Sequence, residues 1–260
     1  MKTSPAEQPE DHSARDGGEK AAGRDAEAHH RPVRSFVLRA GRLTVGQKRA
    51  LDELWPRFGI DAPTGRLDFS EVFGNDHPVI MEIGFGNGDA TWQMAAAEPE
   101  SNFLGVEVHK PGVGHLLLKV EEHGLENVRI YADDAVELLE QHIPPASLAG
   151  VRIYFPDPWP KKRHHKRRIV QAEFIARLAR RMKPGGILHL ATDWAPYAEW
   201  MADVMEASAD FNSEAEQGAF LGRRPSWRPE TKYELRGERL GHEVFDLVYR
   251  RVESGGADHA

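Results

Sequence analysis

Residues 78–97 read PVIMEIGFGNGDATWQMAAA, and this stretch decides the fold. Its first part is a continuous apolar run that ends in a glycine turn, which predicts a buried strand. The part from residue 89 onward is rich in alanine and carries no glycine or proline, which predicts a helix. The stretch therefore indicates a strand, a tight turn and a helix in immediate succession.

The same alternation continues along the rest of the chain. We expect further strands at 101–108, 127–134, 148–159, 187–193 and 242–251. We expect helices at 89–99, 112–124, 135–143, 170–186 and 195–208, with an extra helix at 44–59 ahead of the first strand. Alternation of this kind predicts an α/β fold with a parallel sheet and helices on both faces.

The composition of the chain limits the extent of the folded domain and the cellular environment in which it is expected. The chain has 260 residues, a formal net charge of -7 and no cysteine, which excludes disulfides and thiolate metal sites. Residues 1–34 carry too little apolar character to form a core, so we predict disordered tails at 1–34 and 253–260 around a domain at 35–252. No apolar run approaches the roughly 18 residues that span a bilayer, and we expect a cytoplasmic protein.

Acidic residues stand at the end of nearly every predicted strand. In an open parallel sheet, ligands bind at the carboxyl ends of the strands, beside the point where strand order reverses. An acid at a strand end can also be the N-cap of the following helix. The ordered set favours a ligand that carries cations and hydrogen-bond donors; its members are Glu82, Glu107, Asp133, Asp134, Asp157 and Asp193.

The glycine turn limits the choice of cofactor. Gly84 and Gly86 fit a dinucleotide fingerprint, but Asp89 follows where the third glycine is needed, and a carboxylate there repels a diphosphate. No Gly-Lys-Ser/Thr follows, so a P-loop is excluded as well. S-adenosylmethionine suits the acids better, because its sulfonium, ammonium, ribose diol and adenine amine are all cations or donors. On this interpretation Glu107 binds the ribose, Asp134 meets the adenine region and Glu82 lines the methionine end.

A proline-rich turn follows the fourth strand of this series. Residues 155–168 read FPDPWPKKRHHKRR, and the prolines restrict the backbone around Asp157. The turn invites comparison with the Asn/Asp-Pro-Pro-Tyr/Phe signature of methyltransferases that modify exocyclic amines. It departs from that signature in its proline spacing and in Trp159, which indicates a different target nitrogen. The alternative is a rigid turn with a structural role only.

The basic run 161–168 holds six Lys/Arg and two His in an acidic chain. Such a run is compatible with a solvated face, a nuclear-localisation-like patch or a set of phosphate contacts. Its position directly behind Asp157 favours binding of nucleic acid. The adjacent His164 and His165 lack supporting ligands, so we expect no metal.

Six segments in order carry a resemblance to a known family: EIGFGNGD, GVEVH, DDAVELL, FPDPWPKKRHHKRR, ATDW and RPETKYELRGERLGHEVFDL. Together they resemble the bacterial tRNA (guanine-N7-)-methyltransferase family over roughly residues 36–250. The resemblance implies a Rossmann-like, seven-stranded, mostly parallel methyltransferase sheet. It also implies S-adenosylmethionine as cofactor, tRNA as partner and N7 of guanine 46 in the variable loop as target.

The resemblance extends to individual positions. It implies cofactor contacts at Glu82, Glu107, Asp134 and Asp157, to which the turn of Gly84 and Gly86 is added. It implies contacts with substrate or RNA at Lys161, Arg163, His164, His165, Lys166, Arg167, Arg168, Asp193, Thr231, Lys232, Tyr233 and Glu234.

We assign Asp157 the catalytic role, with Asp193 as second candidate. Glu234 is a candidate for reading the guanine edge, and Trp159 is either a stacking surface or packing. Two other classes stay open: an RNA-binding module without catalysis, and a methyltransferase that acts on protein or a small molecule. The oligomeric state is not predicted.

Overall fold

The computed structural model describes residues 35–36, 41–230, 234, 241 and 243–252, all within Val33–Ala260, the second of two units into which the chain divides. The predicted tails at 1–34 and 253–260 lie outside the described residues. None of the helices that the structure describes combines the length and the apolar character that a membrane span requires.

Strands and helices alternate as predicted from residue 79 onward. The strands are β1 (Gly59–Ile60), β2 (Val79–Ile83), β3 (Asn102–Val106), β4 (Val128–Tyr131), β5 (Leu148–Tyr154), β6 (Met182–Thr192), β7 (Phe211–Ser213) and β8 (Phe245–Arg251). The helices are α1 (Val45–Glu53), α2 (Trp55–Phe58), α3 (Phe69–Phe73), α4 (Asp89–Ala97), α5 (Lys110–Glu122), α6 (Ala135–Gln141), α7 (Ala172–Arg181) and α8 (Ala195–Glu206), with a short 3₁₀ helix, η1, at Lys162–Arg167.

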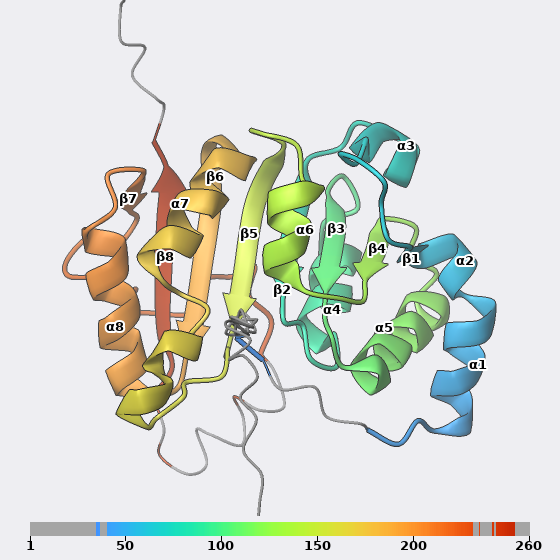
Figure 1. Cartoon of the computed structure of the whole chain (residues 1–260), viewed down its shortest axis with the longest axis horizontal. Helices are drawn as coiled ribbons and strands as arrows, with labels where there is room; N and C mark the ends of the chain where they lie inside the picture. The colour runs from blue at the N-terminus through green and yellow to red at the C-terminus, as the bar shows by residue number, and fades with distance from the viewer. Residues whose placement is uncertain (1–34, 37–40, 231–233, 235–240, 242, 253–260) are drawn as a thin grey trace, which may run out of the picture. The chain divides into compact units, whose positions relative to one another are not determined.

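The strands of the described residues form one sheet in the order β1-β4-β3-β2-β5-β6-β8-β7 (Figure 1). β1 to β6 run parallel, whereas β8 is antiparallel to both of its neighbours. The predicted fold class is confirmed, but the sheet has eight strands, because the two residues of β1 add to its edge by pairing with β4. Strand order reverses between β2 and β5, so a crevice is expected at their carboxyl ends.

Helices cover both faces of the sheet. One hydrophobic core lies under α3, α6, α7 and α8, and the other lies under α1, α2, α4 and α5. β2 contributes to both cores: Met81 and Ile83 face the first, and Ile80 faces the second. All five residues of β2 are buried, which explains the continuous apolar run in the sequence.

Several predicted boundaries were wrong, and three of them have a clear physical reason. The helix expected at 170–186 ends at Arg181, because Pro184 disfavours helical backbone at the residue before it, and β6 begins at Met182. The helix expected at 44–59 divides at Leu54, since Pro56 cannot supply the N–H that a continuous helix needs. The strand expected at 148–159 ends at Tyr154, because Phe155 takes a φ of 51°.

Candidate functional site

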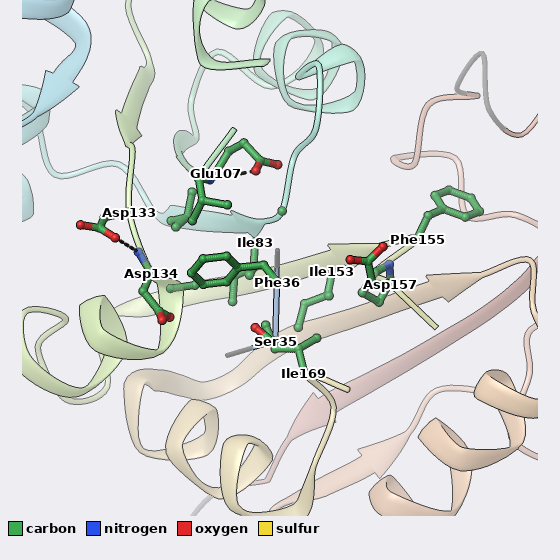
Figure 2. A pocket seen from close by; sticks show the side chains of 15 residues that line it. Ser35, Phe36, Ile83, Glu107, Asp133, Asp134, Ile153, Phe155, Asp157 and Ile169 are labelled. Atoms are coloured by element: carbon green, nitrogen blue, oxygen red, sulfur yellow. Dashed lines mark hydrogen bonds between the residues drawn. The ribbon is translucent and has the colours of Figure 1, made fainter. Parts of the chain in front are cut away.

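Two adjoining cavities open at the carboxyl ends of the central strands. The first has a volume of about 220 Å³ and the second a volume of about 330 Å³. Gly84 and Phe155 line both, so the cavities meet where β2 and β5 end. In Figure 2 the carboxylates of Glu107, Asp134 and Asp157 surround the first cavity, with Ile83 and Ile153 between them.

The glycine turn brings backbone to the mouth of both cavities. Gly84 and Gly86 have φ values of 74° and 60°, a region that side-chain-bearing residues rarely adopt. α5 packs directly on this turn: a Cβ at Gly112 would lie 1.9 Å from the carbonyl oxygen of Gly86. A ligand in the cavities therefore meets bare main chain at this point.

Glu107 and Asp134 are both held by backbone N–H groups. Glu107 Oε2 accepts a hydrogen bond from the N–H of Gly86 at 2.8 Å, and Oε1 accepts from Val108 at 2.8 Å and His109 at 2.9 Å. Asp134 Oδ1 accepts from the N–H of Val136 at 2.9 Å and caps α6, so the cap interpretation is confirmed for Asp134. A carboxylate offers about four lone-pair sites, so capping leaves acceptors for a ligand.

Glu82 lines the second cavity from the end of β2, although its side chain is almost fully buried. The hydroxyl of Thr91 donates a hydrogen bond to its Oε2. Burial raises the pKa of Glu82 to about 7, against the opposing effects of Thr91 and of the Arg152 guanidinium. The carboxyl group is thus poised to ionise when a cation arrives beside it.

Asp157 and Asp193 stand at the ends of the next two strands. Both are exposed; Asp157 lines the first cavity and Asp193 lines the second. The turn that carries Asp157 is stabilised by a residue beyond the turn, because Arg168 Nε donates to the carbonyl oxygen of Pro158 at 2.9 Å. The structure therefore places both candidate catalytic acids at the edges of adjoining cavities, as the strand-end pattern predicted.

The structure divides the basic run into buried and exposed members. Arg168 is buried, with its guanidinium 4.8 Å from the ring centre of Tyr197 and 5.1 Å from that of Trp200. Lys161, Arg163 and Lys166 are exposed. These contacts favour a role for Arg168 in packing the turn against α8, and its assignment to RNA binding stays a prediction.

Trp159 is packed within the protein. Its Nε1 donates to the carbonyl oxygen of Ser35 at 3.1 Å, and the Arg167 guanidinium lies 4.1 Å from the ring centre. Arg167 also donates to the carbonyl oxygen of Phe36 at 3.2 Å. His164 approaches the indole edge-on, and partial burial together with the neighbouring cations lowers its pKa. Packing is thus the interpretation of Trp159 that these contacts favour.

The predicted substrate segment 231–234 is described only in part. Thr231, Lys232 and Tyr233 lie outside the described residues. Glu234 is buried, and its two oxygens accept hydrogen bonds from Arg228 at 2.6 Å and 2.8 Å. Direct reading of a guanine edge by Glu234 stays a prediction; the observed contacts show its carboxylate paired with Arg228.

Sequence reasoning missed Arg228, His189 and Asp246, which form a buried polar cluster with Glu234. The available signal was a polar residue inside an apolar strand, at His189 in ILHLAT and at Asp246 in VFDLV. In the part of the chain that the structure describes, no three His, Cys, Asp or Glu side chains gather as a metal site would require.

Comparison with known proteins gives a consistent picture. The family model Methyltransf_4, described as "Putative methyltransferase", matches residues 76–247. Proteins named tRNA (guanine-N(7)-)-methyltransferase are similar over most of their length. That of Alcanivorax borkumensis is 59% identical, covering 85% of this chain and 92% of the relative. That of Halorhodospira halophila is 57% identical, covering 87% and 98%.

The solved structure of the 16S rRNA methyltransferase KamB superposes with a TM-score of 0.53 at 16% identity, over 76% of this chain and 99% of that one. At this identity the likeness supports the fold alone.

Proposed function

Because the chain belongs to the tRNA (guanine-N(7)-)-methyltransferase family, we propose that it transfers a methyl group from S-adenosylmethionine to N7 of a guanine in tRNA, forming 7-methylguanosine. Guanine 46 of the variable loop is the expected target, and the cytoplasm is the expected location. The observation that carries the proposal is 59% identity over 92% of a relative with this name. The acid-lined cavities are the site at which we place the reaction.

The donor set of the cavities fits this cofactor. When bound, S-adenosylmethionine supplies an electrophilic methyl group on a positively charged sulfur. Glu107 would accept from the ribose hydroxyls and Asp134 from the adenine region, both from the lining of the first cavity, while Glu82 in the lining of the second cavity would hold the ammonium group. Apolar side chains also line the first cavity, and a cofactor packed against them would meet a lower dielectric, which strengthens each of these interactions.

The catalytic work of the protein is positioning and electrostatics. Guanine N7 has an in-plane lone pair and no proton, so no residue has to act as a base. The methylated ring is cationic, and Asp157 stabilises that charge from the edge of the first cavity. A carboxylate here also accepts from guanine N1–H and N2–H₂, which adenine does not offer in this arrangement; Asp193 is the second group able to do so.

Methyl transfer to tRNA is tested directly with labelled cofactor and unmodified tRNA, followed by mapping of the modified nucleotide. We expect 7-methylguanosine at one position of the variable loop. Asp157→Ala should lose turnover by about 100-fold or more and keep most of its tRNA affinity, because the carboxylate acts on charge that develops during the reaction. A product methylated on adenine or on an exocyclic nitrogen would overturn the proposed function, and parental turnover in Asp157→Ala would overturn the assignment.

The exposed part of the basic run is the surface that we propose for the tRNA backbone. Each phosphate neutralised contributes about 0.7 to the salt slope on single-stranded nucleic acid and about 0.9 on a duplex. Replacing Arg163 and Lys166 by Gln should therefore reduce the slope of log affinity against log salt by about 1.4 to 1.8. The matched control replaces two exposed cations, Arg180 in the last turn of α7 and Lys183 at the amino end of β6. Equal slopes for both double variants would refute the assignment.

A further inference from the structure

Arg228 joins two carboxylates that are far apart in the sequence. Its side chain is buried, and it donates to Asp246 through Nε at 2.7 Å and through Nη2 at 2.8 Å. It also donates to Glu234 through Nη1 at 2.6 Å and through Nη2 at 2.8 Å. One guanidinium thus forms bidentate pairs with a residue of β8 and with Glu234, a candidate for contact with the target base.

Among the described residues, two carboxylates of this cluster face the buried guanidinium of Arg228. The exposed Arg224 lies 3.8 Å from Glu234. Burial acts to raise the pKa of Asp246, but hydrogen bonds from His189 and Arg228 outweigh it, and the pKa lies below its ordinary value. Asp246 is therefore ionised at neutral pH despite its burial.

His189 extends the cluster to the end of β5. Its Nε2 lies 2.7 Å from Asp246 Oδ1, and its Nδ1 lies 3.1 Å from the indole Nε1 of Trp227 and 3.1 Å from the hydroxyl of Tyr154. An indole nitrogen only donates, so Nδ1 must be the acceptor and Nε2 must carry the proton. Burial lowers the pKa of His189 to about 4, so this tautomer is held at neutral pH.

Arg228 also touches the loop that carries the candidate catalytic acid. Its guanidinium lies 5.7 Å from the ring centre of Phe155, the residue with positive φ that lines both cavities two positions before Asp157. Buried ion pairs add little net stability compared with apolar packing, because desolvation offsets the Coulomb attraction. What the bidentate geometry adds is a fixed relation between the segments that it joins.

We propose that Arg228 is a positioning residue for methyl transfer: by holding Glu234, Asp246 and the Phe155 ring at once, it fixes Glu234 relative to the Asp157 turn. The proposal rests on the proposed function and deepens it. It predicts that loosening this link affects the chemical step and leaves cofactor binding unchanged, because the contacts of Arg228 are made on the Phe155 and Asp246 side and none is made with Glu107 or Asp134.

The test is Arg228→Lys, which keeps the charge and loses the forked geometry. We expect kcat for tRNA methylation to fall about 100-fold, the loss associated with a displacement of about 1 Å at a reacting centre. The dissociation constant of S-adenosylmethionine, measured by calorimetry, should stay within about twofold. Arg250→Lys is the matched control, since Arg250 on β8 makes an exposed bidentate pair with Glu214 at 2.8 Å and 3.0 Å; it should change neither quantity.

Glu234→Gln supplies an independent variant, should Arg228→Lys fail to fold. It keeps the size of the side chain and weakens the same link, so kcat should fall with cofactor affinity retained. The double variant should be no slower than the worse single variant, because the two residues act as one unit. A kcat within about threefold of the parent in a folded Arg228→Lys or Glu234→Gln variant would overturn the proposal, even if the melting temperature falls.

The outcome for the parent protein separates this proposal from the proposed function. If the parent makes a methylated product other than 7-methylguanosine, the proposed function fails. The ratio of variant to parent turnover on that product still decides the role of Arg228.

Discussion

The carboxylates at the cavities and those of the buried cluster are held in different ways. Glu107 and Asp134 accept hydrogen bonds from backbone N–H groups, most of them within two residues of the acid. Asp246 and Glu234 both accept from the guanidinium of Arg228, which is 18 residues from Asp246 and 6 residues from Glu234. Backbone donors fix a carboxylate and leave its negative charge available to a ligand. The guanidinium instead neutralises the carboxylates of Glu234 and Asp246 and links the two residues to each other. The first arrangement suits binding, and the second suits positioning.

The largest effect that separates the two arrangements concerns stability. Asp246→Ala removes the acceptor of two hydrogen bonds from the buried Arg228 and the acceptor of His189 Nε2. We expect the free energy of unfolding to fall by about 3–5 kcal/mol, the cost of breaking a buried charge network. Asp134→Ala, which removes only the cap of α6, should cost about 1 kcal/mol.

Urea denaturation followed by circular dichroism measures both changes, and the slope of each transition shows whether unfolding stays two-state. Equal losses for the two variants would contradict the distinction between them. It would then follow that water, or relaxation of the loop, supplies the hydrogen-bond acceptors that Arg228 and His189 lose when Asp246 is removed.

The sheet and its acidic edge could be predicted because their signals are local. The apolar run at 78–83 and the glycine turn behind it specify a buried strand and its end without reference to the rest of the chain. The acids at 107 and 134 follow directly from the ends of their own strands. The short strands β1 and β7 were missed, since two or three residues carry no period.

The buried polar cluster could not be predicted, because most of its hydrogen bonds join residues that are far apart in the sequence. His189 and Asp246 are 57 residues apart, and Arg228 and Asp246 are 18 apart. A polar residue within an apolar strand shows that a partner must exist, but not which one. The basic run has the same limitation: its arginines are alike in sequence, yet Arg168 is buried and Arg163 is exposed.

Glu82 shares features with both groups of carboxylates, those at the cavities and those of the buried polar cluster. Its role is tested by a smaller effect, the pH dependence of stability and of cofactor binding. It is buried like Asp246, but it borders a cavity and accepts a hydrogen bond from the hydroxyl of Thr91. Its pKa is raised from 4.5 to about 7, so between these values the folded state binds more protons than the unfolded state. The stability that Glu82 contributes is present below about pH 4.5 and is lost as the pH rises through about 7.

Cofactor binding should have the opposite dependence, because only the ionised form of Glu82 attracts the ammonium group. Below pH 7 we expect the affinity for the cofactor to increase by up to tenfold for each unit by which the pH is raised. Above pH 7 the affinity should no longer change with pH. Calorimetry at pH 6.0 to 7.5, in buffers of different ionisation enthalpy, measures this slope and the proton released. Glu82→Gln should abolish both, whereas Glu107→Gln should weaken binding at every pH and retain the slope. A pH-independent affinity in the parent protein would show that Glu82 binds as the neutral acid, and would class it with the residues that position the site.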